Sequence, residues 1–233
     1  MTKNKFSELE ERIGIQFNDS ANLNMVFIHK SYLNEAPKDQ GIEDNERLEF
    51  LGDAVLELLV TEFLYKNYPN NEGELTNWRS ALVKGSHLAH IAKELELGQY
   101  LVLSHGEEKS GGREKNYILA NTFEALLGAI YLDHGYAVAH TFVDKFVIIY
   151  LEDILEKGLH IDPKSKMQEI AQDKEGSTPY YKLIEDQGPD HEKEFIMGIY
   201  IGEELIATGA GTSKQSAEQA AALAGLKKKG WHS

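Results

Sequence analysis

Three acidic side chains follow one another at helical spacing near residue 50. Glu46, Glu49 and Asp53 stand at positions i, i+3 and i+7, which an α-helix places on one face. Like charges at this spacing repel one another, and in a partly dry site each carboxyl would prefer its protonated form. A divalent cation would remove both problems. The narrow acidic row therefore favours a cation site, although such a row can also be the solvated face of an amphipathic helix.

A second polar pair interrupts the apolar segment 118–129. Asn121 and Glu124 stand at i and i+3, so a helix makes them neighbours. An isolated carboxylate in such a segment needs a partner, because burying a lone charge is costly. Two interpretations remain open: a structural salt bridge with Arg47 or Arg79, or a cation held by oxygen atoms from two helices. Oxygen ligands suit Mg²⁺ or Mn²⁺ better than zinc.

Helical periodicity dominates the chain up to about residue 157. Apolar residues recur at spacings of three and four, as at Leu88, Ile91 and Leu95, which indicates amphipathic helices. The segment that carries Asp53 is apolar around nearly its whole circumference, which is typical of a buried helix. No stretch here alternates long enough to predict a strand. We therefore predict an all-helical (all-α) domain over residues 1–158.

The pattern changes after a short predicted linker at residues 159–161. Asp162 and Pro163 are typical of a helix start, and Ser213 precedes an Ala-rich segment that predicts a second helix. Between these helices the sequence predicts strands over residues 179–184, 194–201 and 205–209. The order helix, three strands, helix over residues 162–231 predicts a small α+β domain. Small side chains on the last helix would let it lie close against the sheet.

Composition excludes several classes of protein. The 233 residues include no cysteine, which excludes disulfide scaffolds, Cys-ligated zinc and thiol catalysis. No stretch approaches the ~18 consecutive apolar residues of a transmembrane helix, and the first residues lack the apolar core of a secretory signal. We expect a cytoplasmic protein with no membrane partner. The net charge of −14 is unusual for a nucleic-acid-binding protein, but residues 162–233 carry 9 Lys and Arg against 12 Asp and Glu, so most of the acidity precedes them.

One segment, residues 45–56, has the sequence N-E-R-L-E-F-L-G-D-A-V-L and resembles the signature of the ribonuclease III family. Four further blocks match that family in the same order, at residues 29–32, 79–83, 109–112 and 123–128. The signature is long and ungapped, so a chance match is rarer than for a four-letter motif. The resemblance covers essentially the whole chain. It implies an all-helical nuclease domain that dimerises and cuts double-stranded RNA with Mg²⁺.

The resemblance also implies a metal-binding quartet of Glu49, Asp53, Asn121 and Glu124. Asp53 and Glu124 match the two residues most tied to hydrolysis. The family often has Asp at the third position, and Asn121 keeps a carbonyl oxygen but loses a charge, so metal affinity is expected to be lower. Mg²⁺ is the expected cofactor, Mn²⁺ is expected to substitute for it, and no small-molecule cofactor is expected. Further acidic residues expected near the cleft are Glu46, Glu72 and Glu107.

Phe50 matches an aromatic residue that, in the family, enters a pocket on the partner subunit, although from sequence alone it could equally be a core residue. The implied homodimer carries one cleavage centre per subunit, and each centre cuts one strand. The products would carry a 5′ phosphate and a 3′ hydroxyl, with a short 3′ overhang. The expected substrates are structured transcripts, such as precursors of ribosomal RNA and also messenger and transfer RNA.

The C-terminal region resembles the double-stranded RNA-binding domain, which contacts A-form RNA over ~16 bp. Its last helix would present its N-terminus to phosphate, where free N–H groups and the helix dipole favour an anion. Gln215 and Glu218 stand where lysine often occurs, so we expect a weak phosphate grip that is strongly salt-sensitive. The RNA-binding residues implied by the resemblance are Gln168, Glu169, His191, Ser213, Lys214 and Gln219.

A second hypothesis is a non-catalytic regulator that binds duplex RNA and keeps the fold. An inactive relative would usually have lost several carboxylates of the quartet. This chain retains three of them, with Asn121 at the fourth position. We therefore favour the nuclease.

Overall fold

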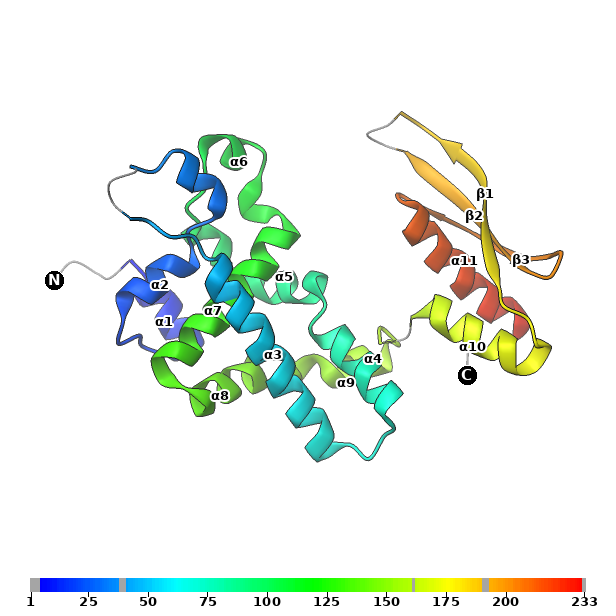
Figure 1. The fold of residues 1–233 in the computed structure, drawn as a ribbon, viewed down its shortest axis with the longest axis horizontal. Helices are drawn as coiled ribbons and strands as arrows, with labels where there is room; N and C mark the ends of the chain where they lie inside the picture. The colour runs from blue at the N-terminus through cyan, green and yellow to red at the C-terminus, as the bar shows by residue number, and fades with distance from the viewer. Residues whose placement is uncertain (1–4, 38–40, 161, 190–192, 232–233) are drawn as a thin grey trace. The chain divides into compact units, whose positions relative to one another are not determined.

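The computed structural model describes residues 5–37, 41–160, 162–189 and 193–231. The chain divides into two units, Met1–His160 and Ile161–Ser233 (Figure 1). Each unit has its own cluster of buried hydrophobic side chains. The first unit is helical, and the second has a three-stranded sheet with a helix before and after it. The predicted fold class is therefore confirmed.

Helices provide the regular structure of the first unit, apart from an isolated bridge between Ile28 and Val102. Its α-helices are α1 (Ser7–Ile13), α2 (Ser20–Val26), α3 (Glu46–Asn67), α4 (Glu72–Leu82), α5 (Gly85–Glu94), α6 (His105–Lys109), α7 (Asn116–His134), α8 (Tyr136–Phe146) and α9 (Leu151–Glu156). Short 3₁₀-helices lie between them: η1 (Lys30–Asn34), η2 (Leu97–Tyr100), η3 (Gly112–Glu114) and η4 (Ile148–Tyr150). No helix in the described ranges is long and apolar enough to cross a membrane.

Helices α3 and α7 cross at the centre of the first unit (Figure 1). The crossing is close because each helix has a glycine there. A Cβ added to Gly52 would lie 1.8 Å from the carbonyl oxygen of Glu124, and one added to Gly128 would lie 2.3 Å from the carbonyl oxygen of Leu48. Neither position has room for a larger side chain. This contact fixes how the polar side chains of α3 face those of α7.

Helix α7 is the centre of this core. Helices α2, α3, α5 and α8 all pack against it, and nearly all side chains of α7 between residues 118 and 130 are buried. Phe123 is fully buried and packs against Phe142 of α8, with ring centroids 5.6 Å apart. A buried, tightly packed helix holds its few polar side chains in fixed positions.

The sheet of the second unit is antiparallel, in the order β1-β2-β3. Its strands are β1 (Tyr180–Gln187), β2 (Glu194–Ile201) and β3 (Glu204–Gly211). Strands β1 and β3 are longer than the sequence predicts, because pairing with β2 extends to polar and small residues such as Asp186 and Ala210. These strand ends lack the apolar alternation on which the prediction depended.

Helices α10 (Pro163–Glu175) and α11 (Lys214–Lys229) lie on one face of this sheet (Figure 1). Both helix starts are as predicted: Asp162 accepts hydrogen bonds from first-turn N–H groups of α10, and Ser213 caps α11. Ala221 is fully buried. The small side chains of α11 therefore let it lie close against the sheet, as expected.

Candidate active site

Glu49, Asp53, Asn121 and Glu124 come together where α3 crosses α7. Glu49 and Asp53 both lie close enough to Glu124 to raise its pKa, and the Asn121 side chain makes a polar contact with Glu49. Glu49, Asn121 and Glu124 are half-buried, whereas Asp53 is exposed. The two helices thus gather the side chains of the predicted quartet into one cluster, which we call the acidic cluster.

Within the acidic cluster, Glu124 has the most strongly raised pKa. Burial, and then repulsion from Asp53 and Glu49, raises the pKa of Glu124 from its ordinary value of 4.5 to about 7. Burial also raises the pKa of Glu49, and the contact with Asn121 offsets only part of that rise. Near neutral pH, the acidic cluster therefore gains stability from any positive charge placed beside it.

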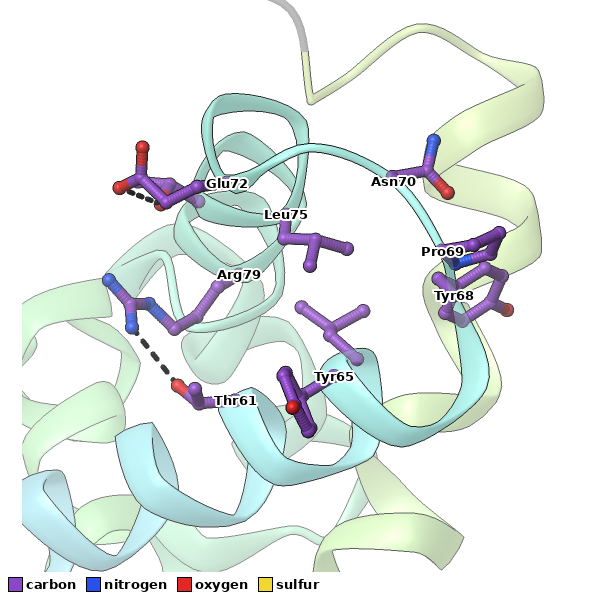
Figure 2. A pocket seen from close by; sticks show the side chains of 10 residues that line it. Thr61, Tyr65, Tyr68, Pro69, Asn70, Glu72, Leu75 and Arg79 are labelled. Carbon is purple, nitrogen blue, oxygen red and sulfur yellow. Dashed lines mark hydrogen bonds between the residues drawn. The ribbon is translucent and has the colours of Figure 1, made fainter.

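The salt bridge considered for Glu124 does not form with either arginine. Arg79 instead pairs with Glu57 at 2.9 Å. It also donates a hydrogen bond to the Thr61 hydroxyl at 3.0 Å (Figure 2). Arg47 is exposed and makes no ion pair with another residue in the described ranges. In the same ranges, Glu124 itself has no cationic partner. The salt-bridge interpretation is therefore wrong, and the cation interpretation remains.

Two of the further acidic residues expected near the cleft have cationic partners of their own. Glu46 pairs with Lys30 at 2.9 Å, and Glu107 pairs with Lys115 at 2.6 Å. Glu72 instead lines a pocket between α3 and α4. In the acidic cluster, the Lys30 ammonium lies near enough to Glu49 to lower its pKa, but Glu124 pairs with no Lys or Arg of the described chain.

The donor set of the acidic cluster fits a hard cation. It offers carboxylate and amide oxygen atoms and no nitrogen or sulfur ligand. Among the described residues, no three His, Cys, Asp or Glu side chains are grouped so as to hold a metal ion by themselves. Mg²⁺ usually keeps several waters and uses one or two carboxylates together with substrate phosphates, so it does not require a closed protein cage. The acidic cluster, with the neutral oxygen of Asn121 among its carboxylates, suits such an ion.

The raised pKa of Glu124 predicts a pH-dependent stability. Between its ordinary pKa of 4.5 and about 7, the folded state holds a proton that the unfolded chain has released. The free energy of unfolding therefore falls as pH rises through this window, by about 2 kcal/mol after allowance for solvent screening. Thermal or urea unfolding in EDTA at pH 4.5 and pH 8 measures the difference. We expect it to be smaller by this amount in Glu124→Gln, and an unchanged difference would contradict the prediction.

A pocket of about 650 Å³ lies between the end of α3 and the start of α4 (Figure 2). The sequence does not reveal this pocket, because its residues come from two helices and the turn between them. The pocket is lined by Thr61, Leu64, Tyr65, Tyr68, Pro69, Asn70, Glu72, Leu75, Thr76 and Arg79.

Phe50, near the start of α3, is 81% exposed, so it is not a core residue of this chain.

The predicted RNA-binding residues of the second unit lie mainly on its two helices. Gln168 and Glu169 are exposed on α10, and Lys214 is exposed at the start of α11. Gln219 is half-buried, and the Ser213 side chain accepts a hydrogen bond as the cap of α11. His191 lies outside the described residues.

Lys164 of α10 pairs with Glu218 of α11 at 2.5 Å. Lys164 stands four residues before Gln168, and Glu218 stands four after Lys214, so each lies on the same helix face as a predicted contact. The ion pair thus brings the two faces together. The sequence does not reveal this ion pair, because its two residues stand 54 positions apart.

Replacing Glu218 with Gln should tighten the binding of duplex RNA, because it frees Lys164 to contact phosphate. We expect a several-fold lower Kd. We also expect the slope of log Kd against log salt concentration to increase by about one, the effect of one additional phosphate contact. Fluorescence anisotropy in EDTA over a salt series measures both. Glu175→Gln is the matched control, since it removes the Lys229 partner in another pair between α10 and α11, at 2.8 Å. Weaker binding by Glu218→Gln would refute the expected competition.

Comparison with known proteins finds a matching family model for each of the two units. A family model described as Ribonuclease-III-like matches residues 19–151, and one described as double-stranded RNA binding motif matches residues 163–229. Ribonuclease 3 of Borreliella afzelii is 46% identical over 226 residues, which cover 97% of this chain and 91% of that protein. Ribonuclease 3 of Pelotomaculum thermopropionicum is 43% identical over 227 residues, which cover 97% and 94%.

A solved structure is similar to the first unit. It is the nuclease domain of ribonuclease III from Campylobacter jejuni, described as having a region involved in dimer formation. The two chains are 39% identical with a TM-score of 0.56, over 61% of this chain and 96% of that one.

A helical nuclease domain followed by a double-stranded RNA-binding domain defines a class of RNA-cutting enzymes. The chain belongs to the ribonuclease III family. It is an endoribonuclease that carries a domain for binding double-stranded RNA.

Proposed function

We propose that this protein is a Mg²⁺-dependent endoribonuclease that cuts both strands of duplex RNA, leaving 5′ phosphates, 3′ hydroxyls and short 3′ overhangs. One observation carries the proposal. Three carboxylates and an amide from two crossing helices lie together, and no Lys or Arg of the described residues neutralises Glu124. Neighbouring, partly buried carboxylates destabilise a fold, and such groups are concentrated at functional sites, where a bound substrate or ion supplies the positive charge.

The side chains of the acidic cluster have separable tasks. Glu49, Asp53 and Glu124 would hold Mg²⁺, or Mn²⁺ in its place, and Asn121 contributes a neutral oxygen and contacts Glu49. When bound, the metal positions the scissile phosphate, lowers the pKa of a water and stabilises the leaving 3′ oxygen. Asp53 is the most exposed member, so it faces incoming substrate, whereas Glu124 is held by the packed core of α7.

The proposal includes a homodimer in which Phe50 of one copy enters the pocket of Figure 2 on the other. An exposed aromatic ring on α3 and an apolar pocket farther along the same helix are complementary features. The exposed side chain of Leu58 lies between them along α3, and the exposed Tyr65 lines the pocket itself, so both would extend the interface. A pair of duplex-cutting sites requires two acidic clusters, which a dimer supplies.

Replacing Phe50 with Ala should weaken this dimer. A buried aromatic anchor at an interface commonly contributes 2 kcal/mol or more, so we expect a dimer dissociation constant raised by about thirtyfold or more. Sedimentation velocity over a concentration series measures it. Leu132→Ala is the matched control, because Leu132 is also an exposed apolar residue, 55% exposed, but lies on α7. An unchanged dissociation constant for Phe50→Ala would place the interface elsewhere.

The proposed substrates are structured transcripts, including precursors of ribosomal, messenger and transfer RNA, and the proposed location is the cytoplasm. Support for the location comes from the absence of cysteine in all 233 residues, which accords with a reducing compartment. No small-molecule cofactor is proposed, because the acidic cluster offers oxygen ligands for a cation alone.

End-labelled duplex RNA tests the proposed function directly. Incubation with Mg²⁺ should yield short duplexes, incubation with Ca²⁺ should yield bound but uncut RNA, and single-stranded RNA should persist. Mass spectrometry of the products should find 5′ phosphates and 3′ hydroxyls. Binding without products in Mg²⁺ and in Mn²⁺ would refute the nuclease and favour the non-catalytic regulator.

A further inference from the structure

Tyr117 stands four residues before Asn121 and seven before Glu124 on α7. An α-helix places these three positions on one face, so Tyr117 extends the row of α7 residues that belong to the acidic cluster. The rest of α7 up to residue 130 is largely buried, yet Tyr117 is 57% exposed. A large aromatic side chain therefore reaches solvent one helical turn from Asn121.

Two lysine side chains, Lys93 and Lys115, lie near the start of α7, where Tyr117 stands. The Lys115 ammonium lies close to the Tyr117 hydroxyl and pairs with Glu107 at 2.6 Å. Lys93 donates a hydrogen bond from its Nζ atom to Oδ1 of Asn116, at 2.9 Å. The amino end of α7 adds its own partial positive charge. The Tyr117 ring thus lies between the cluster proposed to act on a phosphate and a positive helix end that attracts neighbouring phosphates.

The Tyr117 hydroxyl can both donate and accept a hydrogen bond. It makes no hydrogen bond to another residue in the described ranges, and its ring stacks on no other ring there. An exposed aromatic ring with a free polar tip suits a partner that has an apolar face beside a hydroxyl. The ribose of an RNA backbone has both, and its 2′-hydroxyl is the group that DNA lacks.

We propose that Tyr117 is a specificity-determining residue that packs on a ribose beside the scissile phosphate and hydrogen-bonds to its 2′-hydroxyl. The inference rests on the proposed function, because it places the scissile phosphate at the acidic cluster. It goes further by assigning the first unit a direct check for RNA, separate from the duplex recognition of the second unit. Tyr117 lies outside the quartet, so its loss should leave metal binding unchanged.

The test combines Tyr117→Phe with duplex RNAs that each lack one 2′-hydroxyl near the cleavage site. On all-RNA substrate, Tyr117→Phe should lower kcat/KM by about three- to tenfold, the effect of one lost hydrogen bond. At one ribose position, removal of the 2′-hydroxyl should lower kcat/KM of the wild-type protein by a similar factor. The same removal should not lower kcat/KM of Tyr117→Phe any further. Mn²⁺ affinity should be equal in both proteins. Tyr136→Phe is the matched control, since it alters an exposed Tyr beyond the opposite end of α7.

Parallel Kd measurements in Ca²⁺ keep this inference separate from the proposed nuclease. Equal kcat/KM for Tyr117→Phe, or losses that add at every ribose position, would overturn the role of Tyr117. A wild-type protein that binds duplex RNA but never cuts it would overturn the proposed nuclease. The Kd values would then test the role of Tyr117: it stands if, at one ribose position, the losses from Tyr117→Phe and from removal of the 2′-hydroxyl do not add, and it falls if they add at every position. Failure of the wild-type protein to bind duplex RNA would overturn both.

Discussion

Replacing Glu124 with Gln should abolish cleavage of duplex RNA and leave binding intact. Gln keeps the length of the side chain but removes the charge that the acidic cluster offers to a cation. A catalytic metal contributes several kcal/mol of transition-state stabilisation, so we expect kcat to fall by about a thousandfold or more. Duplex binding depends largely on the second unit, and Kd should stay near the wild-type value. Single-turnover cleavage and fluorescence anisotropy measure the two quantities.

A control separates this effect from a general loss of acidic charge. Asp153 is an exposed carboxylate on α9 that pairs with Lys157 at 2.6 Å, outside the acidic cluster, and Asp153→Asn should cut normally. Misfolding is excluded as the cause if Glu124→Gln proves at least as stable as the wild-type protein at pH 8, as the raised pKa of Glu124 requires. Normal cleavage by Glu124→Gln would remove this residue from the mechanism.

Replacing Gly52 with Ala should disrupt both the fold and the site. The added Cβ would lie 1.8 Å from the carbonyl oxygen of Glu124, so α3 and α7 must move apart. Forced separation of packed helices costs about 3 kcal/mol or more, and here it also displaces the carboxylates of α3 from those of α7. We expect a clearly lowered Tm, and loss of cleavage even at temperatures where the variant is folded.

Gly73→Ala is the matched control for this prediction. Gly73 also lies in a helix, α4, but its added Cβ would meet only the Asn71 side chain, at an ordinary 3.4 Å. Ala is a better helix former than Gly, so this variant should be as stable as the wild-type protein or slightly more stable. A Gly52→Ala protein with wild-type Tm would show that the two helices do not touch as described.

Much of the fold, and the two groups of polar residues that form the cluster, could be predicted from sequence because they depend on local spacing. That the two groups form one quartet is implied by the resemblance to the ribonuclease III family. The row Glu49 and Asp53, and the pair Asn121 and Glu124, follow from helical periodicity alone. The helix starts at Asp162 and Ser213 follow from capping chemistry, which involves only neighbouring residues. Where a feature is set by residues close in the chain, its pattern is visible without coordinates.

The remaining features depend on contacts between distant segments. The sequence could not show that Gly52 touches the backbone of Glu124, or that Phe50 is exposed on a helix that looks apolar all round. The pairing of Lys164 with Glu218 spans 54 positions and needs two packed helices. The longer ends of β1 and β3 likewise exist because β2 lies between them.

Anomalous diffraction from crystals soaked in Mn²⁺ tests the central claim most directly. We predict a manganese peak at the crossing of α3 and α7, within coordination distance of carboxylate oxygens of Asp53 and Glu124, and no such peak in crystals of Glu124→Gln. A fully occupied manganese site elsewhere, with the Glu49, Asp53 and Glu124 side chains contacting only water, would contradict the assignment of this cluster as the metal centre.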